Sequence, residues 1–149
     1  MLPKEFKPKA SYQLIRLGKN NDGGYLVESK SIEQTEALIS MGIGKNWSFE
    51  EDFIAHKDIK IHAYDHSIRG LFWIKFFIKR FLSVLIGRFY APYTAVTTYT
   101  NFLHFFRDKA MLFYEQIGTE EENCTNLKKT IERINKKPIF LKIDIEGYE

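Results

Sequence analysis

The sequence has too few cysteines for a disulfide framework and lacks an apolar run long enough to cross a membrane. Its 149 residues include one cysteine, Cys124, so neither an internal disulfide nor a cysteine-based zinc site can form. This scarcity favours a reducing compartment and predicts a cytoplasmic location. Residues 1–9 lack the apolar core of a signal peptide, which argues against secretion by that route.

The sequence also has no large excess of basic over acidic residues. The chain spreads 22 basic residues among 19 acidic ones, for a net charge of +3. Nucleic-acid binding depends on clustered Lys and Arg, so this balance argues against DNA or RNA as a partner. The spacing of the four histidines matches no metal motif, and we expect no metal site.

What the sequence does contain is an alternation of strand-like and helix-like segments. Short apolar runs that predict strands occupy residues 38–41, 59–65, 110–117 and 139–145. Ser31 with Gln34, and Ser48 with Glu51, resemble capping boxes that begin helices, and residues 125–135 have a helical apolar pattern. This order predicts an α/β fold with a parallel sheet. Before it, residues 12–17 and 25–27 flank a glycine-rich turn and predict a short hairpin.

Residues 71–90 do not fit this alternation and carry much of the aromatic content. A helical wheel aligns seven apolar side chains on one stripe: Leu71, Ile74, Ile78, Phe81, Leu82, Leu85 and Phe89. We expect this stripe to pack on the sheet, as in an ordinary amphipathic helix. Peripheral contact with a membrane, favoured by the interleaved basic and aromatic residues, and contact with a protein partner remain as alternatives.

Two features at predicted strand ends indicate a nucleotide site. Gly42 and Gly44 follow the first strand of the predicted sheet, where glycines let the backbone approach a ligand closely. Asp65 ends the next strand, at a spacing typical of the acid that binds a ribose diol. The acidic residues 50–52 in the following helix would repel a pyrophosphate, which favours an adenosine ligand without phosphate there, unless they point into solvent.

The last predicted strand delivers two further carboxylates, Asp144 and Glu146. At the carboxyl end of a parallel strand, such a group can bind an amine, hold a metal or accept a proton. Each carboxylate could instead cap a following helix.

Three blocks, at residues 15–27, at residues 38–53 with 63–65, and at residues 140–149, together resemble the FkbM-type family of S-adenosylmethionine-dependent methyltransferases. Their order and spacing carry the resemblance, and residues 69–107 form an insertion outside it. The resemblance implies a Rossmann-like class I methyltransferase fold in a single partial domain, residues 1–149. Residues 1–30 would be its N-terminal hairpin region and residues 31–149 its Rossmann-like half.

The resemblance also implies roles for individual residues. Gly42 and Gly44 would line the cofactor turn, Asp65 would hold the ribose hydroxyls, and Asp144, with Glu146, would stand near methyl transfer. The family's acidic position is Ser40 here and its third glycine is Asn46, a residue that tolerates a left-handed backbone. Asp22 or Asp144 would then replace the missing acid at the methionine amine.

The expected reaction is O-methylation of a sugar, a glycan or a secondary metabolite. Four strands are fewer than the seven of such a fold, so we expect a truncated or split product, inactive unless a second chain completes the sheet. Two alternatives stay open: a noncatalytic module for adenosine-nucleotide binding or for interaction, and an accessory protein at the inner membrane surface that uses residues 71–90.

Overall fold

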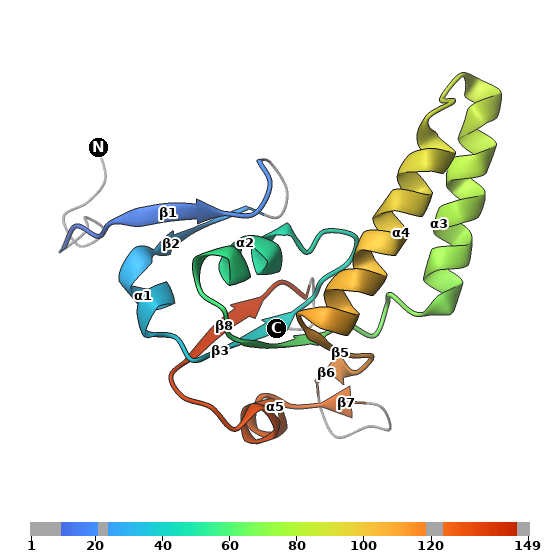
Figure 1. Ribbon diagram of the computed structural model, residues 1–149. Coiled ribbons are helices and arrows are strands. Elements are labelled where there is room, and N and C mark those ends of the chain that lie inside the picture. Colours follow the sequence, from blue (N-terminus) through green and yellow to red (C-terminus); the bar gives the residue numbers. More distant parts are fainter. Residues whose placement is uncertain (1–9, 21–23, 119–123, 146–149) are drawn as a thin grey trace, which may run out of the picture.

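The computed structural model describes residues 10–20, 24–118 and 124–145 (Figure 1). At its centre lies a parallel sheet with the strand order β5-β4-β3-β8. These strands are β3 (Ala37–Met41), β4 (Lys60–Tyr64), β5 (Met111–Phe113) and β8 (Ile139–Ile143). The prediction of an α/β fold with a parallel sheet is confirmed, and this arrangement is consistent with a Rossmann-like topology.

The strand order reverses at β3. From β3 the chain moves outward to β4 and then β5, and it later returns to place β8 on the opposite side of β3. In register, Met41 of β3 lies beside Tyr64 of β4 and beside Ile143 of β8. The carboxyl ends of these three strands are therefore level, and in open parallel sheets ligands bind at such a reversal.

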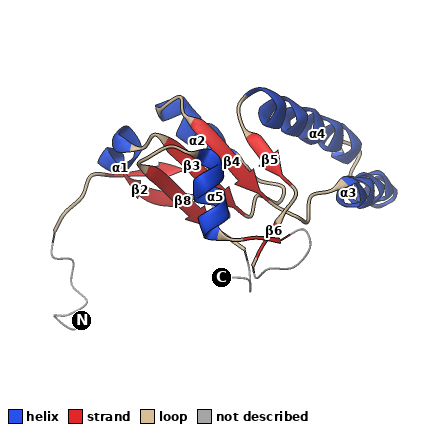
Figure 2. Cartoon of the chain, turned by 90° about the horizontal axis from the view of Figure 1, so that it is seen from below, coloured by secondary structure: helices blue, strands red, loops and turns tan. Residues whose placement is uncertain are grey.

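Side chains alternate between two cores on opposite faces of the sheet. Leu38 and Ile61 belong to the larger core, under α2 (Ser48–His56). Ile39 belongs to the smaller core with Ile134 of α5 (Leu127–Ile134). Figure 1 shows α2 above the sheet and α5 below it, and Figure 2 looks onto the α5 side. Cover on both faces explains why β3 is buried throughout and apolar at every position except Ser40.

The N-terminal hairpin is confirmed, but the predicted capping boxes are wrong. Strands β1 (Leu14–Leu17) and β2 (Tyr25–Glu28) pair antiparallel, and α1 (Ser29–Gln34) begins two residues before Ser31. Ser48 is the first residue of α2 rather than its cap, and neither helix has a side-chain cap. The Ser48 hydroxyl instead accepts a hydrogen bond from the Lys19 amide at 2.9 Å, which ties the hairpin to α2.

The connection from β4 to β5 is a projecting pair of helices. Helix α3 (Gly70–Leu82) leads through the short 3₁₀ helix η2 (Ser83–Ile86) to α4 (Ala91–Asp108), which returns to the sheet (Figure 1). No helix in the described part of the chain is long and apolar enough to cross a membrane.

The apolar stripe of α3 does not pack on the sheet as expected. All seven of its side chains are more than half exposed, whereas Trp73, from another face of α3, is buried. Trp73 contacts Tyr99 and Phe102 of α4, with ring centroids 4.9 and 4.7 Å apart. The aromatic residues of α4 therefore decide which face of α3 is buried.

Two short strands complete the fold. The run at residues 110–117, predicted as one strand, is divided into β5 and β6 (Gln116–Ile117), and β6 pairs with β7 (Cys124–Thr125). Helix α5 begins after Asn126, whose side chain accepts a hydrogen bond from the Lys129 amide.

Candidate functional site

A cavity of about 460 Å³ opens at the carboxyl ends of β3, β4 and β8. Its wall includes the turn after β3, the residues after β4, the segment after β5 and the end of β8. Predicted site residues in this wall are Gly42, Gly44, Asn46, Asp65 and Asp144. The structure therefore brings together side chains and backbone that are up to 102 residues apart in sequence, at the strand reversal.

Gly42 is required by both its backbone conformation and its surroundings. Its φ is +81°, in the left-handed region, and an added Cβ would overlap the main chain of Asp144. The Asp144 amide also donates to the Met41 carbonyl at 2.9 Å. The close approach of the β8 end to the glycine turn thus leaves no space for a side chain at this position.

The Asp65 carboxylate holds the glycine turn. Its Oδ2 accepts hydrogen bonds from the amides of Ile43, at 2.9 Å, and Gly44, at 2.8 Å. Its Oδ1 accepts from the amide and the hydroxyl of Ser67, at 2.8 and 2.7 Å. Burial alone would raise the pKa of Asp65, but these hydrogen bonds outweigh it and lower the pKa below its ordinary value. Asp65 is therefore a charged group that fixes the turn.

Asp144 is exposed and meets the N-terminal hairpin. Its Oδ2 accepts a hydrogen bond from the Tyr25 hydroxyl at 2.6 Å. Tyr25 belongs to β2, so this contact connects the first and last predicted blocks of the site across 119 residues. Asp144 thus has a fixed orientation while remaining accessible from the cavity.

A buried ion pair lies beneath the turn. Lys142 of β8 donates to Glu50 Oε1 at 3.0 Å and to the Gly42 carbonyl at 3.3 Å, and its side chain is 6% exposed. Ser40 donates to the same Glu50 oxygen at 2.5 Å. The ammonium of Lys142 also lies 5.5 Å from the centroid of the Phe49 ring. These contacts join β3, α2 and β8, and Lys142 is also part of the cavity wall.

Other predicted site residues are placed differently. Ser40 is fully buried and is not part of the cavity wall. Asn46 lines the cavity, but its φ is not positive; its Oδ1 accepts hydrogen bonds from the amide and hydroxyl of Ser48, at 3.3 and 2.7 Å. It therefore supports the start of α2. Asp22 and Glu146 lie outside the residues that the structure describes.

The acidic residues at the start of α2 neither face the cavity nor extend freely into solvent. Besides the buried Glu50, Glu51 accepts a hydrogen bond from Trp47 Nε1 at 2.9 Å, and Asp52 accepts one from the Gly18 amide at 2.7 Å. Each carboxylate thus has a protein partner, but the donors to Glu51 and Asp52 are neutral groups that leave the negative charge in place. The expectation that these residues would repel a pyrophosphate therefore stays a prediction.

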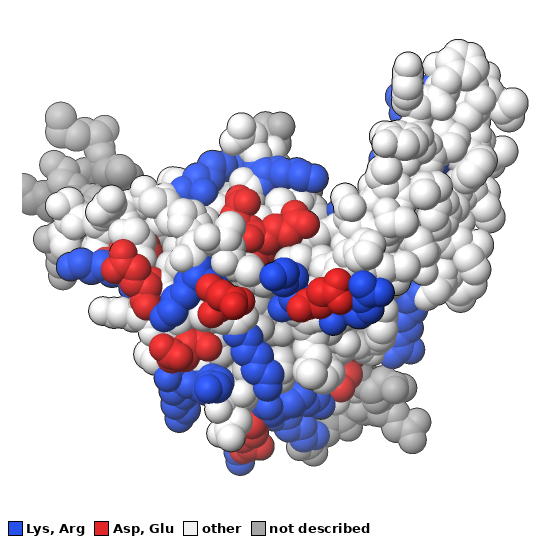
Figure 3. Space-filling view, viewed as in Figure 1, with Lys and Arg blue, Asp and Glu red and all other residues white. Residues whose placement is uncertain are grey.

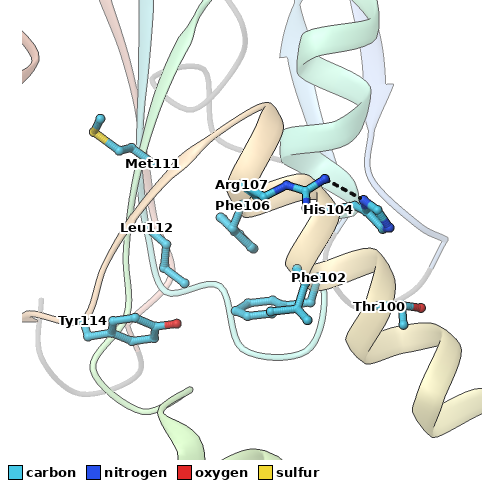
Figure 4. Close-up of a pocket in the computed structure, with 9 residues that line it drawn as sticks. Thr100, Phe102, His104, Phe106, Arg107, Met111, Leu112 and Tyr114 are labelled. Atoms are coloured by element: carbon cyan, nitrogen blue, oxygen red, sulfur yellow. Dashed lines mark hydrogen bonds between the residues drawn. The ribbon is translucent and has the colours of Figure 1, made fainter.

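A second, larger cavity of about 630 Å³ lies between α4 and β5 (Figure 4). Its walls are mainly apolar, with Phe102, Phe106 and Leu112 among them. Arg107 and His104 stand at its edge, and both contact Asp108, at 2.8 and 3.8 Å respectively. Ligand sites combine apolar walls with convergent polar groups, and the cavity at the glycine turn fits that description better.

Two important residues, Lys142 and Tyr25, were missed from the sequence. A charged residue within an apolar strand run is a signal of a buried partner, and Lys142 is such a residue. No comparable signal exists for Tyr25, because its partner is distant in sequence. Among the described residues, no three His, Cys, Asp or Glu side chains are grouped so as to hold a metal ion.

Comparisons with protein-family models, with curated proteins and with solved structures found no match to this chain.

Proposed function

We propose that the chain binds S-adenosylmethionine in the cavity at the glycine turn and transfers its methyl group to a hydroxyl oxygen of a sugar, a glycan or a secondary metabolite. The observation that supports this most directly is the convergence of the Gly42–Gly44 turn, Asp65 and Asp144 at the strand reversal. The cavity volume, about 460 Å³, is within the range of roughly 300–1,000 Å³ common for small-molecule sites.

The hydrogen bonding of the turn favours a ligand without a phosphate at this position. Phosphate binding at a strand-to-helix turn uses free backbone amides. Here the Gly42 amide donates to the Tyr64 carbonyl, and the amides of Ile43 and Gly44 donate to Asp65. A ligand would meet instead the open space beside Gly44, where an added Cβ would have no neighbour within 4 Å.

The two carboxylates at the cavity have different capacities for a ligand. A carboxylate offers about four lone-pair positions, and Asp65 already accepts four hydrogen bonds. A ribose diol would therefore share Asp65 with Ser67 or displace its hydroxyl. Asp144 is the group available to bind an amine or to take a proton from the acceptor hydroxyl.

When bound, S-adenosylmethionine supplies an electrophilic methyl group on its sulfonium. The chain's own contribution would be alignment of the acceptor with that group and removal of the hydroxyl proton. We place the acceptor in the same cavity, whose wall includes Glu115 and Gln116 as well as Asp144.

Calorimetry with the 149-residue chain tests the proposal. We expect binding of S-adenosylmethionine and S-adenosylhomocysteine but not of NADH. Asp144→Asn should weaken S-adenosylmethionine binding by about tenfold or more through loss of a charge-assisted hydrogen bond. Asp108→Asn, at the end of α4, is the matched control and should leave the affinity unchanged.

Methyl transfer is then measured with labelled S-adenosylmethionine and a series of simple glycosides. Transfer to a hydroxyl supports the enzyme. Binding without transfer to any of them contradicts methyl transfer by this chain alone and leaves two explanations, the noncatalytic module and a site that a second chain must complete. Absence of S-adenosylmethionine binding overturns the proposal altogether.

A further inference from the structure

The α3–α4 helical hairpin exposes large apolar side chains up to its end. Beyond α3, five large side chains are between 70% and 84% exposed, and we call them the apolar tip: Leu85, Ile86, Phe89, Tyr90 and Tyr93. The face of the projecting hairpin that Figure 3 shows is almost uncharged, in contrast to the same face of the body, where acidic and basic side chains alternate. Exposed apolar patches of this kind usually mark an interaction surface.

Packing within the hairpin does not need these side chains. The two helices contact each other through buried or half-buried aromatic residues, with Trp73 and Phe77 of α3 against Tyr99 of α4. At the root, Phe102 and Phe106 contact Trp47. The apolar tip lies beyond this aromatic cluster, so its exposure is not explained by the folding of the hairpin.

The charges of the same segment are all of one sign. Between Asp65 and Asp108 the sequence has no acidic residue, although the chain as a whole has 19. The same interval contains six basic residues: Arg69, Lys75, Lys79, Arg80, Arg88 and Arg107. Those from Lys75 to Arg88 are exposed and flank the apolar side chains of α3 and η2.

We propose that the apolar tip inserts into the interfacial layer of a bilayer that contains anionic phospholipids, with Lys75, Lys79, Arg80 and Arg88 contacting the lipid phosphates. Interfacial binding combines buried apolar area with electrostatic attraction to anionic lipids, and this hairpin has both. Tyr90 and Tyr93 suit the boundary, since tyrosine has an apolar ring and a polar hydroxyl. The hairpin lies on the membrane and does not span it.

Two other binding partners for the apolar tip fit these observations less well. A second copy of the chain, docked through the same surface, would bring its basic residues close to their equivalents and repel them. The core of a protein interface is generally depleted of lysine, whereas Lys75 and Lys79 border the apolar stripe directly. A surface of anionic lipid satisfies both the apolar and the basic groups.

Vesicle co-sedimentation of the 149-residue chain tests this inference without any cofactor, so its result is independent of the proposed methyl transfer. Vesicles of phosphatidylcholine alone are compared with vesicles of phosphatidylcholine and phosphatidylserine, at low and at high salt. We expect binding to the anionic vesicles, weakened by salt, and little binding to the neutral ones.

Two double variants separate the apolar and the electrostatic parts. The double variant Leu85→Ser with Phe89→Ser should reduce partitioning into anionic vesicles by on the order of tenfold or more. The double variant Lys75→Gln with Lys79→Gln should reduce it by about fivefold for each charge removed. Leu14→Ser with Leu26→Ser, at two exposed leucines of the β1–β2 hairpin, is the matched control and should bind like wild type. Circular dichroism checks that each variant is folded.

A reporter at the tip distinguishes insertion from simple adsorption. The tryptophan of a Leu85→Trp variant is exposed in solution, and its emission should shift to the blue on anionic vesicles. No sedimentation at low salt, equal binding to neutral vesicles, or an unshifted Leu85→Trp emission would each overturn the proposal. A dimer that forms without vesicles as the protein concentration rises would also overturn the proposal if the Leu85→Ser/Phe89→Ser variant abolishes it. That result would show that the apolar tip binds a second copy of the chain.

Discussion

At the residue scale, the ion pair of Lys142 and Glu50 links the glycine turn to the two elements that flank it. The pair is almost fully buried, and Glu50 also accepts the hydrogen bond from Ser40. A buried ion pair adds little to stability compared with well-packed apolar residues in the same place. Removal of one partner is nevertheless destabilising, because it leaves an uncompensated charge. The effect of this pair on stability is therefore expected to be seen when only one of its two residues is replaced.

We predict that Lys142→Met lowers the free energy of unfolding by about 3–5 kcal/mol, because it removes the cationic partner of the fully buried Glu50. The double variant Glu50→Gln/Lys142→Met should recover a substantial part of this loss. Lys57→Met serves as a control, since the pair of Lys57 with Glu36, at 3.6 Å, lies at the surface and should contribute at most about 1 kcal/mol. Guanidinium unfolding measures all three; a double variant less stable than Lys142→Met would contradict the argument.

The buried side chain of His62 should make the stability of the fold depend on pH. Burial in the sheet, with the positive charges of Lys60 and Arg133, lowers the pKa of His62 to about 4 from 6.5. The unfolded chain thus takes up the proton first, and stability is lost as the pH falls from about 6.5 towards 4. We expect a loss of about 2 kcal/mol between pH 7 and pH 5 from this residue.

The variant His62→Leu tests this pH dependence, since it removes the titrating group from a position where neither ring nitrogen has a hydrogen-bond partner. Urea unfolding at both pH values should show a smaller difference for His62→Leu than for wild type. Equal differences would show that His62 does not titrate in this range.

At the element scale, the turn between β3 and α2 depends on contact with β8 as well as on its own backbone conformation. Gly42 and Gly87 have nearly the same φ, +81° and +82°, but an added Cβ at Gly87 meets no atom within 4 Å. Gly87→Ala should therefore cost only the left-handed backbone strain, about 1–2 kcal/mol. Gly42→Ala should cost clearly more, because the methyl group also displaces Asp144.

Thermal unfolding of the two alanine variants provides a matched comparison of the turns. Equal losses of stability in Gly42→Ala and Gly87→Ala would contradict this expectation, since they would mean that β8 can move away from the turn without a loss of stability.

The central buried strand was predictable from sequence, but the buried face of α3 was not. The run at residues 38–41 is short, apolar and followed by glycine, which is enough to identify a buried strand. The stripe on α3 was equally regular, yet Trp73 is buried in its place because Tyr99 and Phe102 lie opposite. That choice depends on partners 26 and 29 residues further along the chain, which a helical wheel of α3 alone does not include.

The same limit applies to the candidate site. The approach of Asp65 and Asp144 to the glycine turn follows from parallel topology, since carboxyl ends of neighbouring strands lie at one edge. The contact of Tyr25 with Asp144 depends on where the hairpin packs, which no local pattern determines. Ser48 was misread because a capping box and a contact to another element use the same hydroxyl.

At the scale of the whole molecule, one apolar core connects the projecting hairpin to the body. The larger core includes Leu17 of β1, Phe53 of α2 and Ile61 of β4, and it continues to Trp73 of α3 and Phe102 of α4. Trp47, between the glycine turn and α2, contacts Phe102 directly. Loss of the sheet would therefore remove the support of the helical hairpin, and we expect both to unfold together.

The two tryptophans of the chain allow a test of this cooperativity. Trp47→Phe leaves Trp73 as the reporter of the hairpin, and Trp73→Phe leaves Trp47 as the reporter of the body. Each variant should be less stable than wild type by about 1–2 kcal/mol, but within each variant the fluorescence and far-ultraviolet circular dichroism transitions in guanidinium should coincide. A Trp73 transition at lower denaturant than the circular dichroism transition would show instead that the hairpin melts separately. In that case the shared core, from Trp47 to Phe102, would be too weak to couple the apolar tip to the fold that carries the glycine turn.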